Sequence, residues 1–188
     1  MNDNLTHFTS YIQKLRQVLD RLPLENLGEI YHLLQDARDR GSAIYVCGNG
    51  GSASTASHMV CDLSKNTQRQ DKPRLRVMGL NDNIPTLTAY ANDEGYDRIF
   101  AEPVLTYVEE GDVLIAISAS GESENVLQGV RAAQKKGAKT VGLTGYEGGR
   151  LKDLVDLCFI VPSHSIERIE DIHLVVNHLL TVALRESL

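Results

Sequence analysis

The chain has 188 residues, of which 42% are hydrophobic and 23% charged, and a formal net charge of −6 at pH 7. This length is typical of one domain with a substantial core, and the acidic balance argues against nucleic acid as a ligand because no basic face could follow a phosphate backbone. Three cysteines without a C-x-x-C motif, a polar N-terminus and no apolar run of about 18 residues predict a soluble cytoplasmic protein with reduced thiols and no membrane partner.

Two amphipathic helices are expected at the start of the chain. Apolar residues at intervals of three and four predict a helix over 4–21, ended by Pro23, and another over 24–40, with Gly41 as its stop. Both precede the first strand, so neither can be the crossover helix of a β-α-β unit. They must therefore bury their apolar stripes against the final helix or against another subunit.

The stretch 43–63 predicts a strand, an anion-binding turn and a helix. A-I-Y-V-C (43–47) is the strand, G-N-G-G (48–51) is the turn, and Ser52 stands where a helix N-cap is expected. Glycines allow a close approach of the backbone to a ligand, and the free N–H groups of a first helical turn favour a phosphate. The turn matches neither the P-loop nor the dinucleotide fingerprint. On the helix expected over 52–64, His58 and Asp62 are four residues apart and share one face, where they could act chemically.

The remainder of the chain alternates short apolar runs with helical patterns. The expected elements are a polar loop 65–73, a strand 74–79, a helix 83–91, a turn 91–95, helical pattern over 97–108, a strand 113–117, a polar turn 118–123, a helix 123–136, a strand 139–144, a Gly-rich turn 145–149, a short helix 150–153, a strand 156–161 and a long helix 166–185. This alternation predicts an α/β fold with a doubly wound, five-stranded parallel sheet flanked by helices.

The two polar turns, 48–52 and 118–123, each follow a strand. Since ligands of such sheets bind beyond the carboxyl ends of the strands, both turns are expected at one edge. They could close around one phosphate, the first supplying a helix N-terminus and the second the hydroxyls of Ser118, Ser120 and Ser123. Serines are also ordinary turn formers, so the residues alone leave a purely structural role open.

Four motifs together resemble one known family. They are C-G-N-G-G-S (47–52), I-S-A-S-G-E-S (117–123), T-G-Y-E-G-G (144–149) and R-I-E-D-I-H-L-V-V-N-H (168–178). In this combination the chain resembles the sugar isomerase (SIS) family of phosphosugar-binding domains, and within it is most similar to the phosphoheptose isomerases. The resemblance covers essentially 1–188 as one SIS domain, with an N-terminal helical pair (1–41) used in oligomerisation and an α/β phosphosugar-binding core (42–188).

The resemblance implies roles for individual residues. Substrate contacts would come from Asn49, Gly50, Gly51, Ser52, Asp62, Asn92, Asp93, Ser118, Ala119, Ser120, Ser123 and Glu170. One zinc ion per subunit would be held by His58, Asp62, Glu170 and His178, with Asp62 and His178 as the catalytic acid/base pair. Family members are usually homotetramers with sites near subunit interfaces. The implied reaction interconverts sedoheptulose 7-phosphate and D-glycero-D-manno-heptose 7-phosphate through an enediolate, feeding the heptose of a surface polysaccharide.

Several positions depart from the family pattern. Asp62 replaces the usual Glu, Glu170 replaces Gln, Asn66 replaces a substrate-binding Arg, and Ala119 replaces Thr. Two alternatives therefore stay open: isomerisation of another phosphosugar, and a non-catalytic SIS scaffold of the replication-initiator-associating type.

The spacing of Glu170 and His178 also leaves a choice open. Eight residues on one helix separate the two Cα atoms by roughly 12 Å. Either two long side chains meet at one ion, or His178 serves only as acid/base, or one of the two residues serves a neighbouring subunit's site.

Overall fold

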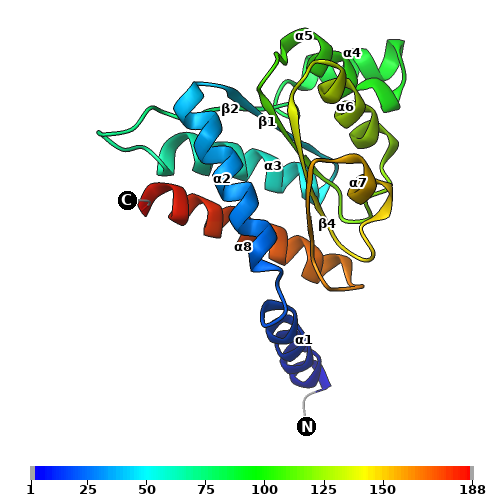
Figure 1. Ribbon diagram of the computed structural model, residues 1–188. Coiled ribbons are helices and arrows are strands. Elements are labelled where there is room, and N and C mark those ends of the chain that lie inside the picture. The colour runs from blue at the N-terminus through cyan, green and yellow to red at the C-terminus, as the bar shows by residue number, and fades with distance from the viewer. Residues whose placement is uncertain (1–2, 187–188) are drawn as a thin grey trace.

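The computed structural model describes residues 3–186. Its strands are β1 (Ala43–Gly48), β2 (Arg76–Gly79), β3 (Val113–Ile117), β4 (Lys139–Thr144) and β5 (Leu157–Ile160). Its helices are α1 (Asp3–Leu19), α2 (Leu24–Arg40), α3 (Gly51–Cys61), α4 (Ile84–Asp93), α5 (Ala101–Tyr107), α6 (Glu124–Lys135), α7 (Gly149–Leu154) and α8 (Ile166–Glu186), with a π-helical turn η1 (Asp62–Asn66) and a 3₁₀ turn η2 (Tyr96–Arg98) (Figure 1).

The strands form one parallel sheet in the order β2-β1-β3-β4-β5. This order and the helices on both faces confirm the predicted doubly wound five-stranded sheet. The direction in which strands are added reverses between β1 and β3, which are adjacent and followed by the two polar turns. Such a switch point leaves a crevice at the carboxyl ends of the strands.

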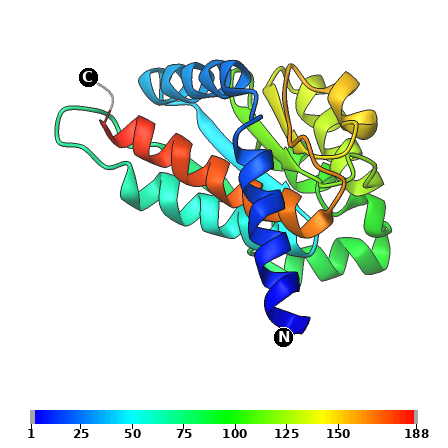
Figure 2. The same cartoon turned by 90° about the horizontal axis from the view of Figure 1, so that it is seen from below.

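Alternate side chains of each strand enter different cores, as the two-residue period of a strand requires. On β1, Ile44 and Val46 join the core beneath α2, α3 and α8, while Tyr45 and Cys47 join the core beneath α4 to α7. Figure 2 shows α2, α3 and α8 together on one side of the sheet, with α4 to α7 on the other. The helices α3 and α8 therefore lie side by side.

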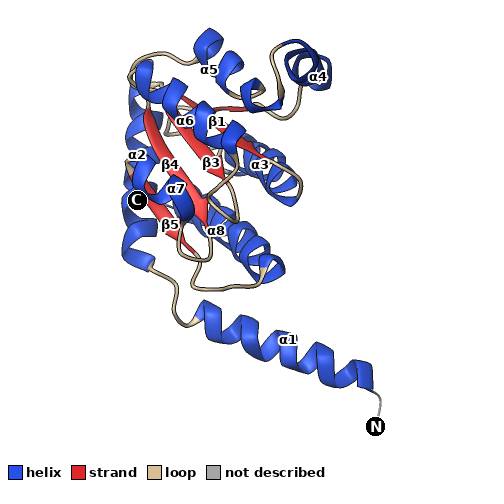
Figure 3. Cartoon of the chain, turned by 90° about the vertical axis from the view of Figure 1, so that its right-hand side faces the viewer, coloured by secondary structure: helices blue, strands red, loops and turns tan. Residues whose placement is uncertain are grey.

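The first helix projects from the body of the molecule (Figure 3). Its residues Leu5, Phe8 and Ile12 are 64%, 67% and 48% exposed, whereas Val18 near its end is buried in the core. The predicted packing of this stripe against the final helix is therefore only partly seen within one chain. Among the described residues, no helix is long and apolar enough to span a bilayer.

Three local predictions need correction. Ser52 is not the N-cap of α3, because the helix begins at Gly51 and Gly50 precedes it with a φ of 54° and a ψ of −120°, a conformation open only to glycine. Asn92 and Asp93 do not follow α4 as a turn but form its last turn. The predicted loop after α3 begins later than expected, since the chain continues through η1 to Asn66.

Candidate active site

The two polar turns meet at the carboxyl edge of the sheet, as predicted. Gly48 at the end of β1 pairs with Ile117 at the end of β3. A cavity of about 140 Å³ lies between the turns, several times the roughly 30 Å³ that one water occupies in the liquid. The residues lining it are Asn49, Ser52, Ile117, Ser118, Ala119, Ser120, Ser123, Ile166 and Glu170. We call this cavity the cradle.

Three helices begin at the cradle. Ser52 belongs to the first turn of α3, Ser123 immediately precedes α6, and Ile166 is the first residue of α8. The first N–H groups of each helix lack intrahelical acceptors, and the helix dipole favours negative charge at that end. The cradle is therefore suited to a tetrahedral anion.

The second of the two polar turns, 118–123, which we call the serine turn, is ordered by the hydroxyl groups of its own residues. Ser118 Oγ donates to Ser123 Oγ over 3.2 Å, and it accepts from the N–H of Gly121 over 3.2 Å. Ser120 Oγ accepts from the N–H of Glu122, also over 3.2 Å. These contacts fix the backbone of the turn, so the hydroxyls line the cradle in a defined arrangement.

Asn49 in the first turn is held by two residues that sequence reasoning missed. Its amide exchanges hydrogen bonds with the amide of Asn125 over 2.8 and 2.9 Å, and its Oδ1 also accepts from the hydroxyl of Tyr96 over 3.0 Å. Asn125 is buried at the start of α6. An amide residue in the first turn of a helix that follows a serine-rich turn was the signal available in the sequence.

Further along α3 and α8, three predicted residues come together. Nε2 of His58 and Nε2 of His178 lie 3.3 and 3.6 Å from Oδ2 of Asp62, and 3.4 Å from each other. Asp62 is 6% exposed, whereas both imidazoles are open to solvent. All three ligand atoms lie within 4.8 Å of one another. Two imidazole nitrogens and a carboxylate oxygen form a donor set suited to zinc, which takes these ligands in tetrahedral sites.

The carboxylate of Asp62 is itself held by two amides. Asn66 Nδ2 donates to Oδ1 over 2.9 Å, and Asn177 Nδ2 donates to Oδ2 over 2.8 Å. Asn66 thus contacts Asp62 directly. Asn177 was missed, although it is a polar residue on the buried stripe of α8 that includes Ile169, His173 and Leu180.

Glu170 lies outside this three-residue group. Its carboxylate packs against Gly51, where a Cβ would stand only 2.3 Å from Oε1, and it lines the cradle with the serines. The same helix therefore carries Glu170 to the cradle and His178 to the His58–Asp62 pair.

Two further predicted residues are not brought into the cradle. Asn92 and Asp93 are exposed at the end of α4, where Asn92 Nδ2 donates to Asp93 Oδ1 over 2.7 Å.

His173, which lies between Glu170 and His178 in sequence, faces the core of the protein. Its Nε2 lies 3.2 Å from the carbonyl oxygen of Thr144, and burial lowers its pKa to about 4.

Comparison with known proteins agrees with this architecture. The family model described as "SIS domain" matches residues 7–145. A phosphoheptose isomerase of Helicobacter pylori (strain ATCC 700392 / 26695) is 39% identical over 182 residues, which cover 96% of this chain and 94% of that protein. A phosphoheptose isomerase of a Nitratiruptor species is 43% identical over 144 residues, covering 77% of this chain and 76% of that protein.

A solved structure extends the likeness to three dimensions. The structure of a phosphoheptose isomerase from Francisella tularensis matches with a TM-score of 0.87 at 30% identity, over 99% of this chain and 98% of that one. The chain therefore belongs to the SIS domain family. Proteins named phosphoheptose isomerase match it over nearly the whole length.

Proposed function

We propose that this protein is a ketose–aldose isomerase that interconverts sedoheptulose 7-phosphate and D-glycero-D-manno-heptose 7-phosphate. The observation that carries the proposal is that α3 and α8 bring two chemically different groups of side chains together, the cradle and the His58–Asp62–His178 group. The cradle lies at the N-termini of α3 and α8, and the His58–Asp62–His178 group lies further along the same two helices. Eight residues of α8, roughly 12 Å, separate Glu170 from His178. An open-chain sugar held in the cradle by its terminal phosphate could therefore extend toward the His58–Asp62–His178 group.

The cradle would bind the substrate. Ser118, Ser120 and Ser123 would donate hydroxyls to the phosphate, and the backbone of Ala119 would add an N–H. Asn49 and Ser52 line the other side at the N-terminus of α3, and the backbone of Gly50 and Gly51, which lies between them in sequence, would also contact the substrate. Asn92 and Asp93, which lie outside the cradle of their own chain, we assign to substrate contacts in a neighbouring subunit's site.

The His58–Asp62–His178 group would carry out the proton transfer. Isomerisation moves a proton between C1 and C2, so one group must remove and return it while another serves the hydroxyl proton. We assign the carboxylate of Asp62 as the base and His178 as its partner, because an imidazole can both donate and accept a proton. Nε2 of His178 lies 3.6 Å from Oδ2 of Asp62, so both groups would act on the same bound substrate.

A zinc ion is the proposed cofactor, held by His58, Asp62 and His178. When bound, it would polarise the substrate carbonyl as a Lewis acid. Glu170 is the fourth residue proposed for the metal. Because its carboxylate packs against Gly51 in one chain, it would reach the ion by turning away from the cradle or across a subunit interface.

Incubation with sedoheptulose 7-phosphate in heavy water tests the reaction. We expect deuterium at C2 and formation of the aldose, both abolished by Asp62→Asn. An Asp62→Asn variant that keeps full biological activity, or a wild-type protein that gives neither deuterium nor aldose while binding the sugar phosphate, would instead support the non-catalytic scaffold.

Isomerisation of another phosphosugar is a second candidate, favoured by two residues at the site. Asn66 contacts Asp62, and Glu170 adds a carboxylate to the cradle. Both change which sugar hydroxyls could be bound. A panel of ketose phosphates of five to seven carbons, assayed with and without chelator, distinguishes the candidates by their kcat/KM.

We further propose that the whole chain, 1–188, acts as one domain in a cytoplasmic homotetramer; residues 1–2 and 187–188 lie outside the described part. The exposed apolar residues of α1 support subunit contacts, since a contiguous apolar surface marks an interaction site. Three free thiols are consistent with a reducing compartment.

A further inference from the structure

The loop after β4 contacts the serine turn backbone to backbone. The N–H of Gly145 donates to the carbonyl of Ala119 over 2.9 Å, and the N–H of Leu151 donates to the carbonyl of Gly121 over 3.0 Å. Gly121 has a φ of 67°, and a Cβ there would stand 2.1 Å from the carbonyl oxygen of Gly148. The T-G-Y-E-G-G motif therefore forms a wall behind the proposed phosphate turn.

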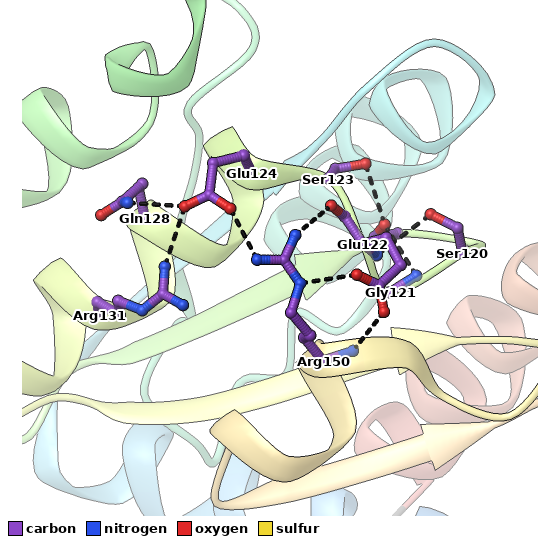
Figure 4. Close-up of polar contacts among 9 residues, drawn as sticks. Ser120, Gly121, Glu122, Ser123, Glu124, Gln128, Arg131 and Arg150 are labelled. Carbon is purple, nitrogen blue, oxygen red and sulfur yellow. Dashed lines mark hydrogen bonds and ion pairs between the residues drawn. The ribbon is translucent and has the colours of Figure 1, made fainter.

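Arg150, which follows this motif, contacts the serine turn through three donors and the first residue of α6 through a fourth (Figure 4). Its backbone N–H and Nε donate to the two carboxylate oxygens of Glu122 over 2.9 and 2.7 Å, and Nη2 donates to the carbonyl of Glu122 over 3.0 Å. Nη1 donates to Oε2 of Glu124, the first residue of α6, over 2.9 Å. One side chain thus joins α7, the serine turn and the N-terminus of α6.

The same contacts place positive charge against two carboxylates. Glu122 and Glu124 flank Ser123, which lines the cradle. Hydrogen bonds from Arg150 lower the pKa of both carboxyl groups, so both carry negative charge beside the place assigned to a phosphate. Without a nearby cation, the negative charge of these carboxylates would disfavour a dianion in the cradle.

A single exposed ion pair contributes little to stability, but Arg150 differs from such a pair. Its guanidinium makes two charge-assisted hydrogen bonds to Glu122 and one to Glu124, and these restrict orientation as well as distance. Arg131 provides the contrast, because its Nη1 reaches only Oε1 of Glu124, over 3.2 Å, from within α6.

We propose that Arg150 is a positioning residue for phosphate binding: it holds the serine turn in its binding geometry and offsets the charge of Glu122 and Glu124. Arg150 is not among the residues that line the cradle, so it acts through the turn and not on the ligand. This inference rests on the proposed function only in that the cradle binds a phosphate group.

The test compares Arg150→Ala with wild type and with Arg131→Ala as the matched control. Titration calorimetry with inorganic phosphate gives Kd, and turnover of the sugar phosphate gives KM and kcat. For Arg150→Ala we expect about a tenfold rise in Kd and KM, the loss expected for charge-assisted hydrogen bonds to the turn, with kcat within about twofold because ground-state and transition-state binding weaken together. Arg131→Ala should match wild type.

Two further variants separate charge from geometry. Arg150→Lys keeps the charge but loses the fork, so we expect partial rescue, about a threefold rise in Kd. The double variant Glu122→Gln/Arg150→Gln keeps the local net charge but loses the hydrogen bonds from the guanidinium to the turn. It should still bind phosphate more weakly than wild type. If Arg150→Ala does not fold, the lysine variant alone decides, since an unchanged Kd contradicts the proposal.

The outcomes distinguish this proposal from the proposed function. A wild-type protein that binds no phosphate would contradict the cradle itself. A wild-type protein that binds phosphate, with Arg150→Ala and Arg150→Lys binding it equally well, would overturn the role of Arg150 and leave the cradle intact.

Discussion

Asn177 donates a hydrogen bond from Nδ2 to Oδ2 of Asp62 over 2.8 Å, and both side chains are buried between α8 and the end of α3. Asn66 holds the other carboxylate oxygen. Two amides thus fix the plane of the carboxylate that we propose as the base. The bond also links the helix that carries His178 to the segment that carries the proposed base.

Replacing Asn177 should therefore impair catalysis. Asn177→Leu keeps the volume but removes the donor to Asp62, and supporting contacts of this kind are typically worth about 10- to 100-fold in activity or metal affinity. We expect a loss of that size in kcat and in zinc affinity, measured by steady-state kinetics and competition with a chelator. Thr181→Val is the control, because its buried hydroxyl, one turn further along α8, has no hydrogen-bond partner among the described residues. Equal losses in both variants would indicate a general defect of α8.

Metal content should separate the three-residue group from Glu170. His58→Gln and His178→Gln each remove a nitrogen from the group, so the zinc bound per subunit should fall strongly, as measured by elemental analysis after dialysis. Glu170→Gln should retain most of its zinc, since Gln can still offer an oxygen and the carboxylate lies in the cradle. Loss of zinc in Glu170→Gln equal to that in His178→Gln would place Glu170 among the essential ligands.

Glu170→Gln should also strengthen phosphate binding. The substitution removes a negative charge from the cavity that would hold a dianion, and a unit charge nearby is worth on the order of 1 kcal/mol or more at a solvated site. We expect the Kd for inorganic phosphate to fall about three- to tenfold. Glu167→Gln, an exposed carboxylate earlier on α8 that hydrogen-bonds Ser165, is the control. Weaker phosphate binding in Glu170→Gln would mean that the carboxylate serves the ligand directly.

Folding stability should decrease as the pH falls, in a way that depends on His173. Burial lowers its pKa to about 4, from a value of 6.5 for the free side chain. Below about pH 6.5 His173 is protonated in the unfolded chain but stays neutral in the folded chain. Folding stability therefore decreases by about 1.4 kcal/mol per pH unit until pH 4. Urea unfolding at several pH values should show a shallower loss for His173→Gln over this window. His164→Gln, which alters an exposed histidine, should leave the slope of wild type unchanged.

The exposed stripe of α1 should support oligomerisation. Phe8→Ser combined with Ile12→Ser removes two of its most exposed apolar side chains, so we expect light scattering to show a species smaller than that of wild type. Leu105→Ser, at a partly exposed residue of α5 on the opposite side of the sheet, should keep the wild-type mass. An unchanged mass in the α1 variant would exclude this surface as the subunit contact.

The sequence by itself determined the class of fold and the place of the site. Buried apolar runs over 113–117 and 139–144 have the length and composition of strands covered on both faces, and their alternation with helices requires a parallel sheet. Turns that follow such strands must share one edge. For this reason the meeting of 48–52 with 118–123 was predictable, as was the common face of His58 and Asp62.

Only the tertiary structure decided which side chains meet. Asn177, Asn125 and Arg150 contact residues distant in sequence, and each would be unremarkable on its own helix. Likewise, the eight-residue spacing of Glu170 and His178 on α8 was compatible with both residues binding one ion and with each residue serving a different site. In the structure Glu170 lines the cradle whereas His178 lies beside His58 and Asp62, because a straight helix carries such a pair roughly 12 Å apart. The periodicity of apolar residues determines which face of a helix is buried. The position of that helix along a neighbouring helix depends on how the two helices pack.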